Sequence, residues 1–494
     1  MINLDQLAEV AQNFSAGFWI NDGKKVQKKP QNPIAARQAL YNSDPRPDKV
    51  SLAQGMVFND KDRIRVYHRE SNTWYDSVEE AEAKGYTRKA CEIFKNKKGK
   101  IFHSPAVFIA QQRALERYRE QQFGEDLTKN PAAYGTPVAP ALQTAIQFDG
   151  EDIYGKGAYD AGKTISYQTI GMASGYKHLT IPVLNSVRNS LGFPPIDTIV
   201  MGTNFYGAYN ATFDNLKMVR YRYMNENGEF DFKSFQKAAE MLDPKTTMFL
   251  FDMSTGNNFI GTRRTKEDNE NIVQILVDKQ FYSEHDIAYP NFDPDFHPDG
   301  EIYRILKKIG APHGIQSSRG KKDKYASRLA FHHLFLGTGE QRSEIFSYLV
   351  TENRNSFLAM PDTWMHLTEM ANDISLREAH EKDSRTFIEI VRDSRNNLSE
   401  ALSWNWMKHR SGMFDMVNIN HKGADRMGEE YGIYVVPVRN QNIVGKDGLP
   451  VEVIRIKHGM SDAVIAKVSD ALKTTIQKYP SETGQANPDI ILAR

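Results

Sequence analysis

The chain has 494 residues, of which 40% are hydrophobic and 25% charged, with a formal net charge of +1 at pH 7. Its length suits two domains, its composition excludes wholesale disorder, and its balanced charge gives no bias toward nucleic acid or anionic membranes. The single cysteine, Cys91, excludes an intramolecular disulfide and a cysteine-rich zinc site. The chain opens without a signal-peptide pattern and holds no apolar run of bilayer length, so we expect a cytoplasmic protein.

The first 103 residues predict two separate features. Residues 1–56 are mixed and punctuated by proline, which favours an N-terminal arm that also forms part of a small domain. Residues 57–103 alternate aromatic and β-branched stretches with charge, and predict an inserted excursion. Within it we expect strands over 64–68 and 100–104, and between them a short helix capped by Ser77.

From residue 104 to residue 378 the pattern predicts a large α/β domain. Residues 105–122 have helical spacing. Strand-like and helix-like segments then alternate with short connections, which argues for a mostly parallel sheet covered on both faces. Function then belongs in the loops at the carboxyl ends of its strands. Strands are expected over 197–202, 216–223, 246–254, 282–289 and 329–337, and helices over 231–242, 265–280 and 301–310.

Residues 379–494 predict a smaller α+β domain. A long amphipathic helix over 378–404 is expected to bridge the two domains. Two strands follow, over 432–438 and 451–457, and a helix over 462–479 closes the domain.

Four polar clusters lie at the ends of these elements, namely 172–179, 253–261, 285–293 and 317–328. A parallel sheet brings such loops to one edge. Ser174 and Gly175 at a helix start could cradle a phosphate, and Arg328 could clamp the same phosphate. An aspartate can keep a ring nitrogen protonated, and a lysine can form an imine with an aldehyde. Together these groups are what pyridoxal phosphate needs.

The order and spacing of these segments resemble the class I, aspartate/aromatic amino acid aminotransferases, which are pyridoxal-phosphate enzymes of fold type I. The resemblance runs from about residue 44 to the end, apart from 57–103. "DIAY" is similar to the family's Asp-x-Ala-Tyr, which implies Asp286 on the pyridine nitrogen and Tyr289 on the ring oxygen. "NNFIG" is similar to the family's Asn-Pro-Thr-Gly and implies that Asn258 bonds the ring oxygen, although Phe259 and Ile260 depart from the pattern.

The same resemblance implies further cofactor contacts. Tyr206, or Phe205 as the alternative, would stack on the cofactor ring. Ser174, Gly175 and Arg328 would bind the phosphate. Tyr134 would cross the interface of a homodimer to reach the phosphate of the neighbouring subunit.

The lysine loop departs from the family. The family's lysine lies eight residues before the arginine, a position that Gly320 occupies here. Lys321 lies three residues after Ser318, the family's spacing to a phosphate-binding serine. The resemblance therefore implies that Lys321 forms the imine and acts as the general base, with Lys322 as the alternative.

The resemblance also implies substrate contacts. Gly55 would lie against the substrate, and Arg455 would hold its α-carboxylate, with Arg439 as a competitor. Arg354 would reach across from the neighbouring subunit to a second carboxylate.

The implied activity is transamination between an amino acid, dicarboxylic or aromatic, and a 2-oxo acid. The alternatives are another pyridoxal-phosphate reaction that starts from the same carbanion, namely a β-decarboxylase, lyase or cyclase, or a relative without catalysis. No metal site is expected, because the adjacent His332 and His333 point to opposite faces of a strand.

Overall fold

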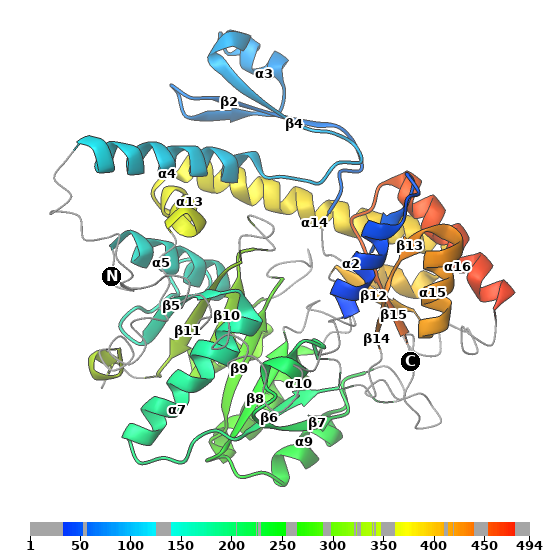
Figure 1. Cartoon of the computed structure of the whole chain (residues 1–494). Helices are drawn as coiled ribbons and strands as arrows, with labels where there is room; N and C mark the ends of the chain where they lie inside the picture. The colour runs from blue at the N-terminus through cyan, green and yellow to red at the C-terminus, as the bar shows by residue number, and fades with distance from the viewer. Residues whose placement is uncertain are drawn as a thin grey trace, which may run out of the picture.

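The structure is a computed structural model, shown in Figure 1. It describes residues 33–52, 57–124, 140–203, 205–223, 225, 229–252, 264–289, 298–320, 323, 328–337, 339, 342–346, 361–409, 413–417, 419–438 and 453–479.

A seven-stranded sheet forms the centre of the large α/β part, with the order β5-β11-β10-β9-β8-β6-β7. Neighbouring strands are parallel from β10 to β7, whereas β11 is antiparallel to both β10 and β5. The predicted α/β fold with a mostly parallel sheet is therefore confirmed. The strands are β5 Thr164–Ile170, β6 Thr198–Gly202, β7 Lys217–Tyr221, β8 Thr247–Asp252, β9 Tyr282–Ile287, β10 His313–Ser318 and β11 Leu329–Phe335.

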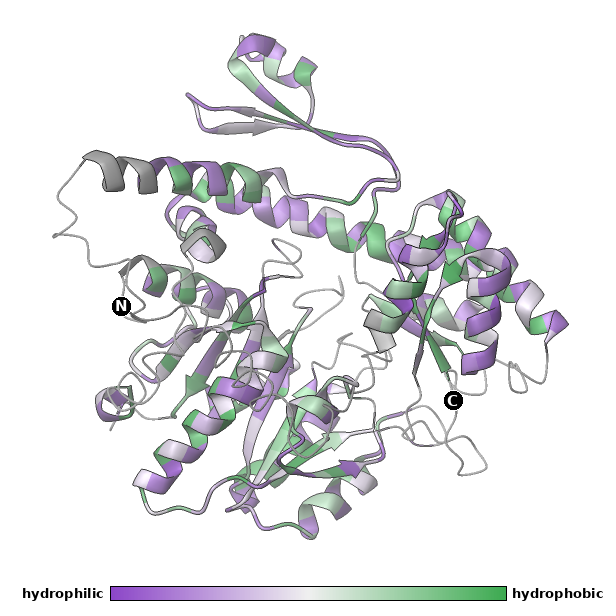
Figure 2. Ribbon diagram, viewed as in Figure 1, coloured by the Kyte–Doolittle hydropathy of each residue, from purple (hydrophilic) through white to green (hydrophobic). Residues whose placement is uncertain are grey.

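Helices separate most of these strands along the chain and pack on the sheet (Figure 1). Thr265 begins α10 with a capping box: its hydroxyl accepts from the Asp268 amide at 3.0 Å, and the Asp268 carboxylate accepts from the Thr265 amide at 2.8 Å. In Figure 2 green, hydrophobic residues gather on strands β6 and β8, whereas β9 and β10 carry many purple, hydrophilic residues. The helices of this part are α4 Pro105–Gly124, α5 Pro140–Tyr154, α6 Met172–Gly175, α7 Ile181–Ser190, α8 Tyr209–Thr212, α9 Phe232–Glu240, α10 Lys266–Lys279, α11 Ile302–Lys308 and α13 Pro361–Asn372.

The smaller α+β part has an antiparallel sheet of order β12-β15-β14 and a parallel pair of β1 with β13. Its elements are α2 Pro33–Ser43, β1 Val50–Ser51, β12 Phe414–Val417, α15 His421–Tyr431, β13 Ile433–Tyr434, β14 Val436–Val438, β15 Val453–Lys457 and α16 Asp462–Lys478. The long helix α14, Ile374–Leu402, runs between the two parts in Figure 1. Leu376 near its start packs in a core with Trp364, whereas Leu398 near its end packs with Val453, so α14 contributes to both cores.

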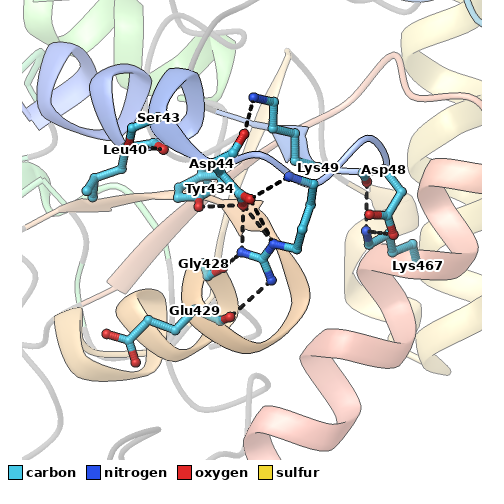
Figure 3. A network of polar contacts seen from close by, with 10 residues as sticks. Leu40, Ser43, Asp44, Asp48, Lys49, Gly428, Glu429, Tyr434 and Lys467 are labelled. Carbon is cyan, nitrogen blue, oxygen red and sulfur yellow. Dashed lines mark hydrogen bonds and ion pairs between the residues drawn. The ribbon is translucent and has the colours of Figure 1, made fainter.

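The segment after α2 is fastened to the small part by charged groups, as Figure 3 shows. The Asp44 carboxylate accepts from Arg46 at 2.6 Å and from the Tyr434 hydroxyl at 2.7 Å. Arg46 also donates to the Gly428 carbonyl at 2.5 Å, near the end of α15. These bonds hold the N-terminal segment against the end of α15, where the Gly428 carbonyl also accepts from the Gly432 amide.

Residues 57–103 form a small three-stranded sheet with one α-helix and a short 3-10 helix, Arg88–Ala90, which lies beside α4 and α14 (Figure 1). Its elements are β2 Arg63–His68, β3 Thr73–Tyr75, α3 Val78–Ala83 and β4 Cys91–Asn96. The strand expected over 64–68 and the Ser77-capped helix are confirmed. The strand expected over 100–104 is wrong: β2 pairs with β4 instead, and Ile101 makes only an isolated bridge to Phe58.

None of the helices in the described ranges is long and apolar enough to cross a bilayer.

Candidate active site

A buried carboxylate marks the end of the central strand β9. Asp286 is 2% exposed, and its backbone lies between Asp252 of β8 and Gln316 of β10. The Asp286 carboxylate also affects Tyr176, which lies in the helical segment after β5. Burial raises the pKa of Tyr176 most, and the negative charges of Glu284 and Asp286 raise it further. The predicted ring-nitrogen partner therefore lies at the carboxyl edge of a parallel sheet, where such folds bind ligands.

The helix start at residue 172 packs against the neighbouring strands without room for a side chain at Gly175. A Cβ there would lie 2.9 Å from the Thr169 hydroxyl and 3.1 Å from the Gln316 amide nitrogen. Gly171 precedes the helix with a positive φ of 64°, which favours glycine. Ser174 is exposed beside this tight contact. A five-residue π-helical turn, Tyr176–Thr180, follows α6, and such turns occur at functional sites.

The two residues of the lysine loop that are predicted to bind the phosphate, Ser318 and Arg328, lie at the two ends of the loop, next to each other's neighbouring strands. Ser318 ends β10, and Arg328 immediately precedes β11, which pairs with β10. The Gly171 amide donates to the Arg328 carbonyl at 2.6 Å, so Arg328 adjoins the turn that leads to Ser174. The loop was expected to begin at Ser317, but Ser317 and Ser318 belong to strand β10. Ser317 is fixed there because its hydroxyl donates to Asp149 at 2.5 Å.

Tyr289 and Arg455, from the two parts of the molecule, both lie against the ring of Phe414. Tyr289 is 2% exposed, and its ring centroid lies 5.9 Å from that of Phe414, nearly perpendicular to it. The Arg455 guanidinium lies 4.1 Å from the centroid of the same Phe414 ring. Phe414 therefore joins a predicted cofactor residue of the large part to the predicted carboxylate-binding arginine of the small part.

The two candidates for ring stacking differ in their surroundings. Phe205 is 3% exposed and lies under the Arg220 guanidinium, 4.5 Å away. Tyr206 is half-buried and packs against hydrophobic cores of both parts of the molecule. Tyr206 therefore lies where the two parts of the molecule meet.

Several predicted residues lie outside the described residues. They are Gly55, Tyr134, Asn258, Lys321, Lys322, Arg354 and Arg439.

The described side chains fit pyridoxal phosphate by their chemistry. A buried carboxylate, Asp286, suits a protonated ring nitrogen. Ser174, Ser318 and Arg328 would offer hydroxyl and guanidinium donors to a phosphate, and Gly175 lets the helix start lie close against the Thr169 and Gln316 side chains. Within the described ranges, no group of three or more metal-ligating side chains is found.

Sequence reasoning missed two buried cations near these residues. Arg319, whose side chain is 2% exposed, contacts three carboxylates. Lys457 is 1% exposed, and its ammonium lies 4.3 Å from the centre of the Phe58 ring. Arg319 has one partner nearby in the sequence, Asp323, but its partners Asp149 and Asp152 come from distant parts of the chain. The Phe58 ring beside Lys457 is equally distant in the sequence, so local spacing gives little signal for either cation.

Replacing Lys457 with methionine is expected to raise the melting temperature at pH 6 by about 3 °C or more. Burial lowers the pKa of Lys457 from 10.5 to about 7. Between pH 7 and pH 10.5 the unfolded chain therefore binds more protons than the folded chain, so the free energy of unfolding of the wild type rises with pH across this range. The cost of burying the Lys457 ammonium is present in full below pH 7. Methionine removes a penalty of a few kcal/mol, of order 1.4 kcal/mol per pKa unit.

Calorimetry at pH 6 and pH 10 checks this expectation, and the gain should shrink at the higher pH. Lys473→Met, at an exposed lysine of α16, is the matched control and should change little. Equal melting temperatures for wild type and Lys457→Met at pH 6 would contradict it.

Comparison with known proteins gives one consistent answer. No family model matches the chain. The aspartate aminotransferase of Pseudomonas aeruginosa is 20% identical over 425 residues, 83% of this chain and 92% of the relative. The mitochondrial aspartate aminotransferase of Dictyostelium discoideum is 21% identical over 89% of this chain and 92% of the relative. A match to the Escherichia coli aromatic-amino-acid aminotransferase, 21% identical, covers 38% of this chain and only 50% of the relative.

Solved structures share the fold. The aromatic-amino-acid aminotransferase of Burkholderia pseudomallei, whose structure has pyridoxal phosphate covalently bound, superposes with a TM-score of 0.69 at 17% identity. That match covers 92% of this chain and 100% of the other. The cytoplasmic aspartate aminotransferase of Giardia lamblia gives 0.69 at 18% identity, over 93% of this chain and 100% of the other. The chain is therefore similar in sequence to aspartate and aromatic-amino-acid aminotransferases, and it has the fold of their solved structures.

Proposed function

We propose that the protein is a pyridoxal-phosphate-dependent aminotransferase that moves an amino group between an amino acid and a 2-oxo acid. The observation that carries the proposal is the position of Asp286, a buried carboxylate at the end of β9. The strand beside it ends at Ser318, and the turn before α6 bonds to Arg328. The aminotransferase names of the sequence and structural relatives support the same activity and cofactor.

When bound, pyridoxal phosphate supplies an aldehyde for covalent attachment and a ring that accepts electrons. Asp286 would hold a proton on the ring nitrogen, and Tyr289 and Asn258 would donate hydrogen bonds to the ring oxygen. The Lys321 amine would attach the cofactor and later move the substrate's α-proton. Tyr206 would pack on the ring face. The phosphate would be held by Ser174, Gly175, Ser318 and Arg328.

The substrate and assembly assignments belong to the same proposal. Arg455, with Arg439 as competitor, would bind the α-carboxylate, and Gly55 would line the substrate site. We infer a cytoplasmic homodimer in which Tyr134 and Arg354 reach the neighbouring subunit's site. The proposed division has an arm at 1–56, the inserted sheet at 57–103, a cofactor domain at 104–378 and a small domain at 379–494.

Reduction with borohydride tests the proposal directly. The purified protein should be yellow, and reduction should bleach the colour and attach the cofactor to the peptide that contains Lys321, because borohydride reduces an imine to a stable amine. Peptide mapping by mass spectrometry locates the attachment. An adduct on Lys322 or Lys324 would reject the lysine assignment but keep the enzyme class. The absence of an adduct on every peptide would overturn the proposal.

A second candidate is another reaction of the same cofactor, such as β-decarboxylation or elimination. It is favoured by the shortened spacing between Lys321 and Arg328, which changes the loop that aligns the breaking bond. An assay with ¹⁵N-labelled amino acids distinguishes the two. Transamination transfers the label to an added 2-oxo acid, whereas decarboxylation keeps it on the shortened amino acid and elimination releases ammonia.

A further inference from the structure

A buried ionic network lies against the loop that connects β10 to β11. At its centre is Arg319, whose side chain is 2% exposed. Its Nη1 atom lies 2.5 Å from an Asp152 oxygen and 3.3 Å from an Asp149 oxygen. Its Nε atom donates to Asp323 at 2.7 Å. Asp149 in turn accepts from Ser317 at 2.5 Å and lies 2.9 Å from His333, so the network extends into the sheet.

Asp323 is the unusual member of this network, because it comes from within the loop yet points inward. Its side chain is 1% exposed, whereas aspartates in loops are mostly solvated. Its carboxylate lies 3.2 Å from Nε2 of His380 on α14 and 3.6 Å from Nε2 of His366 on α13. Although burial opposes ionisation, the charge of Arg319 holds the pKa of Asp323 well below its usual range.

The backbone of the loop is fixed at the same place. The Asp323 amide donates to the Arg319 carbonyl at 2.8 Å, and the amides of Arg319 and Gly320 both donate to the Leu329 carbonyl. Lys321 and Lys322 are the only residues between Gly320 and Asp323. In the sequence, Lys321 directly follows Gly320 and Lys322 directly precedes Asp323, two residues whose backbone amides are hydrogen-bonded.

Stability alone is a weak explanation for such a cluster. Burying charges costs several kcal/mol per ion, and apolar replacements of buried ion pairs often stabilise a protein. What an ionic cluster does supply is a defined geometry, because each charge must keep its partner. In this protein the cluster fixes the loop between β10 and β11 relative to α13 and α14. Helix α14 contributes residues to both hydrophobic cores.

We propose that Asp323, paired with Arg319 and lying beside His366 and His380, is a positioning residue that sets the place of the cofactor-attaching lysine by anchoring its loop to α13 and α14. The inference rests on the proposed function and adds to it a group that does not touch the cofactor. Anchoring restricts the lysine's backbone and so raises the fraction of time in which its amine is in reach of the reacting atoms.

The test is Asp323→Asn, which keeps the size of the side chain and removes its charge. Arg319 still has Asp149 and Asp152, so we expect the variant to fold. In the loaded enzyme, the fraction of bound cofactor that borohydride attaches to Lys321 should fall at least twofold, and kcat should fall about 10-fold or more. In the apo-protein, hydrogen exchange at the amides of 319–323 should become about 10-fold faster, because the anchor is lost.

Two further variants separate positioning from general stability. His380→Gln changes a single contact of Asp323 and should give the same changes at smaller size. Asp76→Asn is the matched control, because Asp76 forms an exposed ion pair with Lys382, which lies on α14 as His380 does. It should leave attachment, kcat and loop exchange unchanged. Attachment and kcat at wild-type values in Asp323→Asn, together with an adduct on Lys321 in wild type, would overturn this inference alone. No adduct in wild type would overturn it together with the proposed function.

Discussion

Asp286→Ala is expected to lower kcat for transamination by at least about 100-fold while the protein stays folded. The carboxylate would form a charge-assisted hydrogen bond that keeps the ring nitrogen protonated, and without it the ring accepts electrons less well. A 100-fold loss corresponds to about 2.7 kcal/mol of transition-state stabilisation, a reasonable size for such a group in a buried site.

Steady-state assays and absorption spectra of the loaded variant check this expectation. The matched control is Glu284→Gln, on the same strand and equally buried, because Glu284 has its own partners in Tyr282 and His332. That variant should lose stability but keep kcat within a few-fold. Near-normal turnover in Asp286→Ala would mean that the carboxylate only ends a strand.

The local signals in the sequence predicted much of the fold. Thr265 and Asp268 form the expected start of α10, Ser77 caps α3, and apolar runs mark β6, β8 and β11. These elements were readable because caps and buried runs are encoded within a few residues.

The strands that were missed have long-range causes. β10 reaches Ser318 although its last two residues are polar, because Ser317 bonds to Asp149, 168 residues away. The excursion pairs β2 with β4 rather than with 100–104, since register depends on the partner strand as well as on local propensity.

The candidate site also has features that the sequence predicted and features that only the structure shows. The spacing of Asp286 and Tyr289 placed both residues on one strand end, and the structure adds Phe414 as the ring between Tyr289 and Arg455. The inward turn of Asp323 could not be predicted, because a charged loop residue is usually solvated and its histidine partners lie on two later helices.

Arg455→Ala is expected to reduce kcat/KM for every amino acid that the enzyme accepts by about 100-fold or more. All of these substrates share the α-carboxylate, which a planar guanidinium binds through two parallel hydrogen bonds. The position of Arg455 suits this role, because the residue is 4% exposed and its guanidinium packs 4.1 Å from the centroid of Phe414, beside Tyr289. Removing one partner of a buried charged pair costs about 2–5 kcal/mol, which is roughly two or more decades.

Arg354→Ala should behave differently, because the proposed role of Arg354 is to bind a second carboxylate. Its kcat/KM should fall for aspartate and glutamate by about two decades more than for an aromatic or aliphatic amino acid. Arg439→Ala is the matched comparison for Arg455→Ala. If kcat/KM falls for all substrates in Arg439→Ala and stays at the wild-type value in Arg455→Ala, then Arg439, and not Arg455, binds the α-carboxylate. Equal losses for both substrate classes in Arg354→Ala would show that Arg354 is structural. If the wild type accepts no dicarboxylic amino acid, the residues that select the substrate should be sought first in the inserted segment 57–103. Its residue Phe58 packs against Lys457, which lies two residues after Arg455 on β15.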